Sequence, residues 1–118
     1  MEKAINIFSA LSDETRIRMI KLLENAGEVC VCDIMKALDI SQTRASRNLN
    51  ILKASGLVID RRDKFWIYYK LNKLTAEACC GDVLKVVHKW LHVNDVISKD
   101  RARLKNVMKH NKKEKKND

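Results

Sequence analysis

The 118-residue sequence contains no proline and only three glycines, Gly27, Gly56 and Gly81. Folds built from many short strands need frequent turn residues, so this scarcity argues against sandwiches and barrels and favours helices. The chain has no apolar run near the roughly 18 residues of a membrane span. Residues 1–6 also lack the apolar stretch of a secretory signal. We therefore expect a cytoplasmic protein without a membrane partner.

Positive charge is distributed unevenly along the chain. Lysine and arginine number 24 against 15 acidic residues, for a formal net charge of +9. Residues 98–118 alone contribute +6, which leaves residues 1–97 only mildly basic. The length is typical of one domain. We expect that domain over residues 1–97, followed by a basic tail over 98–118 that is frayed or disordered.

Apolar residues recur at helical spacing along most of the chain. One predicted helix begins after Ser12, a candidate N-cap, and closes at Gly27; another is capped by Ser41 and stops at Gly56. The predicted helices span residues 3–11, 13–24, 31–38, 42–55 and 74–97.

The pattern changes from a period of 3.6 to a period of 2 after Gly56. Residues 58–61 and 65–71 are β-branched or aromatic runs around Arg62-Asp63-Lys64, which predicts a β-hairpin. Two short helices joined by a tight turn and followed by a basic hairpin indicate a mainly α fold, the winged helix-turn-helix.

The helix over 42–55 has a polar face without any acidic residue opposite its apolar face. Phosphates repel carboxylates, so this face favours contact with double-stranded operator DNA, and the basic hairpin favours contact with its backbone. The alternative is an ordinary solvated helix face and turn. The candidate DNA-contacting residues are Ser41, Gln42, Thr43, Ser46, Arg47, Asn50, Arg61, Arg62 and Lys64.

The four cysteines form two close pairs, Cys30/Cys32 and Cys79/Cys80. In a chain without a secretory signal we expect thiols rather than disulfides. Cys-x-Cys spacing is too short for a zinc knuckle, and thiolates without a cluster of histidines or carboxylates suit soft ions such as arsenite or antimonite. The alternative is that Cys30 and Cys32 are small buried hydrophobic side chains.

Several segments together resemble the ArsR/SmtB family of metal-responsive repressors. Residues 10–18 are similar to its N-terminal signature, and Glu28-Val29-Cys30-Val31-Cys32-Asp33-Ile34 resembles the metal box of its arsenic-sensing branch. Residues 41–57 and 60–71 resemble its recognition helix and wing. The resemblance covers roughly residues 5–72. It implies a homodimeric repressor that releases operator DNA when arsenite or antimonite binds, with no organic cofactor.

Two positions depart from that pattern. Met35 stands where the best-known metal box has a third cysteine, and a thioether is a poor ligand for trivalent arsenic. A third sulfur would then come from Cys79 or Cys80, and relatives with cysteine ligands on the C-terminal helix give this a precedent. Lys64-Phe65 replaces the glycine-containing tip that is common in the family's wing. The candidate metal ligands are Cys30, Cys32, Cys79 and Cys80.

The helices at the two ends of the domain carry more apolar side chains than so small a core can bury. We expect them to pair across a two-fold axis and form a dimer that contacts two half-sites of a palindrome. The side chains predicted to lie in this interface include Ile5, Phe8, Val83, Val87, Trp90 and Leu91.

Other chemistry is less well supported by the sequence. His88 and His92 lie one helical turn apart, but the remaining ligands of the family's zinc sensors are missing, so we interpret them as half-exposed histidines. No phosphate loop or Ser/His/Asp grouping occurs, so we do not expect an enzyme. Three alternatives stay open: a repressor switched by cysteine oxidation, a sensor of cadmium or zinc, and a DNA-binding or interaction module with inert thiols.

Overall fold

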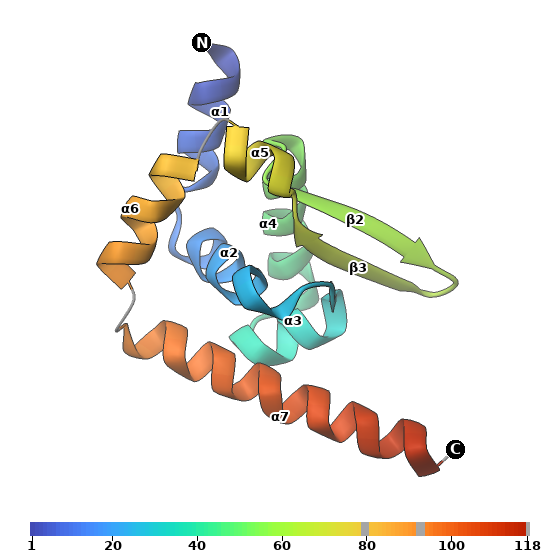
Figure 1. Cartoon of the computed structure of the whole chain (residues 1–118). Coiled ribbons are helices and arrows are strands. Elements are labelled where there is room, and N and C mark those ends of the chain that lie inside the picture. The colour runs from blue at the N-terminus through green and yellow to red at the C-terminus, as the bar shows by residue number, and fades with distance from the viewer. Residues whose placement is uncertain (79–80, 92–93, 118) are drawn as a thin grey trace.

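The computed structural model describes residues 1–78, 81–91 and 94–117, and Figure 1 shows how their helices and strands are arranged. The elements, in chain order, are α1 (Glu2–Ala10), α2 (Glu14–Ala26), β1 (Val29–Cys30), α3 (Val31–Leu38), α4 (Gln42–Ala54), β2 (Val58–Asp63), β3 (Trp66–Leu71), α5 (Lys73–Ala78), α6 (Gly81–Leu91) and α7 (Asp95–Asn117).

The hydrophobic core lies where α2, α3 and α4 meet the base of the hairpin. Ile20, Ile34 and Leu49 are completely buried there, one from each helix. Each belongs to the apolar stripe expected of its helix. Helices α3 and α4 form the helix-turn-helix, and β2 and β3 extend away from the core as the wing (Figure 1). The winged helix-turn-helix prediction is confirmed.

The sheet has one strand that was not predicted from the sequence. The short strand β1 pairs antiparallel with β3, placing Cys30 opposite Tyr68, and the strand order is β1-β3-β2. This pairing holds Cys30 in an extended conformation, with φ −67° and ψ 143°, immediately before α3. The chain therefore enters α3 from a strand.

The helix ends show which capping predictions were correct. The N-cap of α2 is Asp13, whose carboxylate accepts a hydrogen bond from the Arg16 backbone N–H. Ser12, predicted for this role, instead donates its hydroxyl to the carbonyl oxygen of Ser9. Ser41 caps α4 as expected. Asp13 is the N-cap because its side chain accepts a hydrogen bond from the third N–H of the helix, as an N-cap side chain typically does.

The C-terminal region differs most from its prediction. A single helix over 74–97 is replaced by α5, α6 and the start of α7. Asn94 explains the start of α7, because its side-chain oxygen accepts hydrogen bonds from the backbone N–H groups of Val96 and Ile97. An asparagine in this position is a strong N-cap and therefore starts a new helix.

The expectation of a frayed tail from residue 98 is also corrected, because α7 continues to Asn117. This helix packs mainly against α3 and also against α2. Its Ile97 and Leu104 are buried, and Met108 packs against the core, so its few apolar residues share one face. Packing on α3 thus stabilises a segment whose polar composition alone does not indicate a helix.

Buried and partly buried polar contacts attach α7 along the length of α3. Asp100, 1% exposed, binds the Arg18 guanidinium through both carboxylate oxygens, at 2.8 and 2.9 Å. Arg103 donates to Asp100 and to the carbonyl oxygen of Ala37, near the end of α3. At the other end, the Asn111 amide donates to the carboxylate of Asp33. Helix α7 therefore holds both ends of the helix that contains Cys32.

Among the residues described, no helix combines the length and the apolar surface that crossing a membrane requires.

Candidate DNA-binding surface and thiol site

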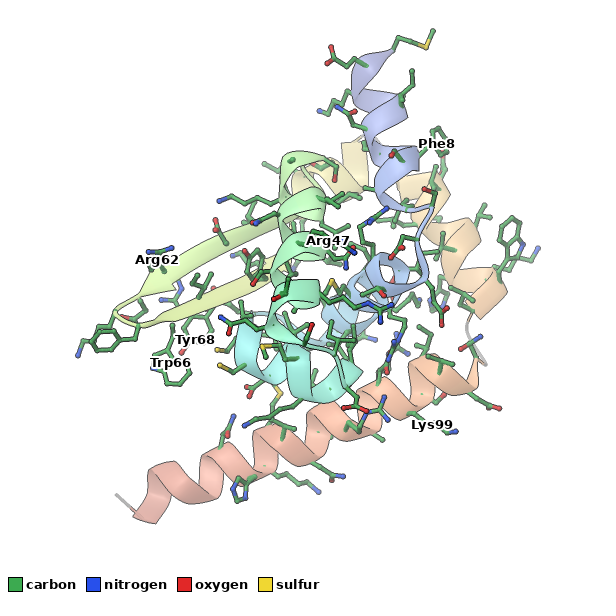
Figure 2. All side chains as sticks on the ribbon, turned by 180° about the vertical axis from the view of Figure 1, so that it is seen from behind. Phe8, Arg47, Arg62, Trp66, Tyr68 and Lys99 are labelled. Carbon is green, nitrogen blue, oxygen red and sulfur yellow. The ribbon has the colours of Figure 1, made fainter. Side chains whose placement is uncertain are left out.

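The exposed face of α4 is polar, as predicted. Successive helical residues are about 100° apart, which places Thr43, Arg47 and Asn50 opposite the buried residues Ala45 and Leu49. Gln42 and Ser46 lie on the edge of this face toward the wing, where they line a cavity with wing residues. Figure 2 shows this side of the molecule, with Arg47 on α4 and Arg62 and Trp66 on the wing.

Two arginines fix how α4 is held, and the sequence analysis assigned neither of them this role. The Arg16 guanidinium, on α2, donates to the side-chain oxygen of buried Asn48 at 2.9 Å. Arg44, on α4 itself, donates to the Thr15 hydroxyl at 2.8 Å. Residue type alone does not reveal such contacts, because they join positions about 30 residues apart in the chain.

On the wing, the basic residues predicted to contact DNA differ in their surroundings. Arg61 forms hydrogen bonds with the Glu28 carboxylate, and its guanidinium lies over the ring of Tyr68, 4.7 Å from the ring centroid. Arg62 is exposed and lines the cavity between the wing and α4. Arg62 is therefore the better placed of the two for a phosphate.

The wing turn forms without glycine. Asp63 pairs with Trp66, so Lys64 and Phe65 are the two turn residues. Lys64 is exposed and has φ 54°, a left-handed conformation that costs a non-glycine residue roughly 1–2 kcal/mol. The departure from a glycine-containing tip therefore changes the backbone strain of the turn, while the basic side chain stays at the tip.

Cys30 and Cys32 lie at the junction of β1 and α3. Both are free thiols; Cys30 is buried and Cys32 is exposed. Because Cys30 is extended, its side chain is not forced to the face of α3 opposite Cys32, as it would be in a continuous helix. Both residues line the same cavity.

The electrostatic surroundings of Cys30 oppose ionisation of its thiol. Burial raises the pKa of Cys30, the neighbouring Cys32 thiol and Asp33 carboxylate raise it further, and the hydrogen bond from the Cys32 backbone acts in the opposite direction. The thiol therefore stays protonated in the absence of an ion. Binding of a thiophilic ion must displace its proton.

One cavity of about 460 Å³ connects the thiol pair with the candidate DNA-binding surface. Its walls come from the start of α3, the edge of α4 and the wing. They include both cysteines and four of the residues predicted to contact DNA. The residues that line this cavity include Cys30, Cys32, Met35, Gln42, Ser46, Asn50, Arg62 and Trp66.

Three residues singled out from the sequence lie outside the described residues: Cys79, Cys80 and His92. His88 is described, and its Nδ1 atom lies 2.9 Å from the buried Lys21 ammonium nitrogen, which also donates to Glu24. Within the described ranges, no three side chains of His, Cys, Asp or Glu gather as a metal site. The ligand role of Cys79 and Cys80 stays a prediction.

Apolar side chains remain exposed on α1 and α6, at the end of the molecule away from the wing tip (Figure 1). Ile5 and Phe8 are 57% and 60% exposed, and Trp90 is 75% exposed. Helix α6 has no buried residue among those described. Val83 is half-buried and packs against the core of its own chain, and its place in a dimer interface stays a prediction.

The fold and the polar face of α4 define a winged helix-turn-helix domain, in which the second helix of the pair lies in the major groove of DNA. Residues 13–60 match the model of the family described as bacterial regulatory protein, arsR family. The chain belongs to this arsR family. The matched region includes α2, α3, both described cysteines and α4.

Two curated relatives are named for arsenic resistance. The arsenical resistance operon repressor of Escherichia coli K12 is 47% identical over 68 residues, which span 58% of each chain, less than two thirds of the relative. The arsenic resistance transcriptional regulator ArsR1 of Pseudomonas putida KT2440 is 44% identical over 72% of this chain and 69% of its own.

A solved structure has the same architecture. The homodimeric winged helix-turn-helix DNA-binding domain of Mb0332 from Mycobacterium bovis matches with a TM-score of 0.64 and 28% identity. The match covers 79% of this chain and 86% of that domain.

Proposed function

We propose that this protein is a transcriptional repressor that binds operator DNA as a homodimer and releases it when arsenite or antimonite binds Cys30 and Cys32. The observation that carries the proposal is the cavity that the thiol pair shares with Gln42, Ser46 and Asn50 of α4. An ion bound there acts directly beside the surface that contacts DNA. The names of the arsenic-resistance relatives support the choice of ion.

In this proposal α4 lies in the major groove and the wing contacts the backbone beside it. Arginine donates two parallel hydrogen bonds to guanine, whereas asparagine and glutamine donate one hydrogen bond to adenine N7 and accept one from its N6 amino group, so Arg47, Asn50 and Gln42 supply base contacts. Arg62 supplies a phosphate contact, which positions the domain without selecting a sequence.

Arg47→Ala is expected to weaken binding to the preferred operator by about 1–3 kcal/mol and to relax the preference for one base pair. The exposed side chain has no part in the core, so the fold remains intact. Fluorescence anisotropy with operator and scrambled duplexes at several salt concentrations measures both effects. Arg62→Ala is the matched control: it should weaken both duplexes alike and reduce the salt dependence. Equal operator affinity of Arg47→Ala and the unmodified protein would exclude α4 as the recognition helix.

The homodimer is proposed from the exposed apolar side chains of α1 and α6, which include Phe8 and Trp90, because exposed apolar patches often mark protein–protein interfaces. Sedimentation equilibrium at micromolar concentration should give twice the chain mass of 13.6 kDa. Phe8→Glu should shift the protein toward monomer, because it buries a charge in the interface. A monomeric unmodified protein would contradict the proposal.

Release follows from how the ion holds the entrance to α3. Two sulfurs bound to one ion at roughly 2.3 Å each are at most about 4.6 Å apart, so binding fixes Cys30 relative to Cys32. Helix α3 packs on α4, and any shift at its first turn moves α4 relative to the second copy in the dimer. The ion needs only to bind the DNA-incompetent arrangement more tightly; such coupling is typically about 1–3 kcal/mol.

Selection from a random duplex library, followed by titration of the selected complex, tests the whole proposal. We expect a palindromic site, and we expect arsenite to release the protein under reducing conditions without an oxidant. Release by peroxide but not by arsenite would instead establish the redox switch. Binding that responds to neither would establish a regulator with inert thiols.

A further inference from the structure

A third sulfur-containing side chain, that of Met35, lines the same cavity as the cysteine pair. Cys32 and Met35 are three residues apart on α3, a spacing that places side chains on one face of a helix. Cys30 directly precedes this helix, with an extended backbone. All three side chains line the cavity beside α4.

The three sulfur atoms differ in their chemistry as metal ligands. Two are thiols that become anionic thiolates on binding, and the third is a neutral thioether. Thiolate and thioether ligands together favour Cu(I), whereas trivalent arsenic bonds to thiolates and gains nothing from a thioether. In the described part of the chain no histidine or carboxylate completes a three-ligand site with the cysteines.

Met35 also has the freedom that a ligand needs. It is only partly buried, at the edge of the core rather than within it. Its unbranched side chain has three rotatable bonds, so the sulfur can move toward an ion without moving α3. The fully buried Met19, in contrast, is packed in the core of α2.

We propose that Cys30, Cys32 and Met35 bind Cu(I) in a three-coordinate site, with Met35 as the residue that favours this ion. Copper binding itself does not depend on the repressor function proposed above; only its expected effect on DNA binding rests on that function. Two thiols release two protons, and the resulting complex of one Cu⁺ and two thiolates has a charge of −1. Arsenous acid reacting with the same two thiols releases two waters and leaves a neutral complex with one hydroxyl. The copper complex therefore places a negative charge beside the DNA-binding edge of α4 and opposes the approach of phosphates.

The test measures Cu(I) affinity in the absence of DNA, by competition of the full, reduced chain with a chromophoric Cu(I) chelator. Met35→Leu conserves volume and removes the donor. Loss of indirect contacts at metal sites typically lowers affinity 10–100-fold, and we expect the loss of this bond to lower Cu(I) affinity by about tenfold or more. Arsenite affinity should stay unchanged. Met108→Leu, at a partly buried methionine on α7, is the matched control and should keep the unmodified affinity for both ions.

A spectroscopic measurement makes the test independent of the variant's stability. Protein grown with selenomethionine should show a copper–selenium distance in X-ray absorption, and Met35→Leu and Cys30→Ser should each remove it. Unchanged Cu(I) affinity in Met35→Leu, or the absence of a copper–selenium distance, would overturn the proposal. Neither result bears on release of DNA by arsenite, so a failure of the copper site and a failure of the repressor function are distinguishable.

Discussion

Replacing Cys32 with serine is expected to leave operator binding intact and to abolish its release by arsenite. The side chain is exposed, so the hydroxyl is solvated and the fold is retained. Serine removes one of the two thiolates that the ion needs, and one remaining sulfur cannot fix Cys30 relative to α3. The coupling between ion and operator should therefore fall from its typical 5–150-fold to no effect. Titration of the operator complex with arsenite, followed by fluorescence anisotropy, measures the loss.

Cys30→Ser should have the same consequence for release, although this buried position has a greater effect on stability. The matched control is Cys79→Ser/Cys80→Ser, which keeps the pair at α3. It should weaken the response if one of these residues supplies a third thiolate, and it should leave the response unchanged if two thiolates suffice. Full release of Cys30→Ser/Cys32→Ser by arsenite would transfer the sensor site to Cys79 and Cys80.

The parts of the fold predicted correctly from sequence are those determined by local patterns. The predicted helix over 31–38 coincides with α3, and the one over 42–55 differs from α4 by one residue at its end. The Ser41 cap and the left-handed glycine at Gly56 mark the boundaries of α4. Such features depend on side chains within one helical turn of each other, so one sequence is sufficient to find them.

Features that depend on distant segments were missed. A two-residue strand such as β1 has no detectable period, and its pairing becomes visible only when β3 lies beside it. Helix α7 looks like a charged tail because the groups that hold it, including Arg18 and Ala37, lie more than 60 residues earlier. The start of α7 is different: Asn94-Asp95 is an N-cap signal that the sequence does contain.

For the candidate site too, the sequence predicts individual residues but not how the fold brings them together. Cys30 and Cys32 were predicted as candidate ligands from their spacing together with the resemblance to the family's metal box, and the structure places Cys30 in an extended conformation directly before α3. Their position in one cavity with Gln42, Ser46 and Arg62 required the folded arrangement of α3, α4 and the wing. The Glu28 partner of Arg61, which distinguishes it from Arg62, required the structure as well.

Asp100→Ala is expected to lower the free energy of unfolding by about 3–5 kcal/mol, because it leaves the charge of Arg18 without its buried partner. The Asp100 side chain is 1% exposed and that of Arg18 is 14% exposed, so solvent screens this pair weakly. The Asp100 carboxylate raises the pKa of Arg18, which keeps the guanidinium charged in the folded protein. Small domains commonly have only 5–15 kcal/mol of stability, so the variant should unfold at a much lower urea concentration.

Urea unfolding followed by far-UV circular dichroism measures this effect, and the neighbouring Lys99→Ala is the matched control. Lys99 lies on the exposed side of α7 (Figure 2), and its replacement should change stability by no more than about 0.5 kcal/mol. Arg103→Ala should fall between the two, because the Arg103 side chain is 43% exposed and Asp100 keeps Arg18 as a partner. If Asp100→Ala proves as stable as Lys99→Ala, the buried Arg18–Asp100 pair does not attach α7 to the domain. The basic segment would then be a separate arm, and α3 would keep its position through its contacts with α2, α4 and the sheet.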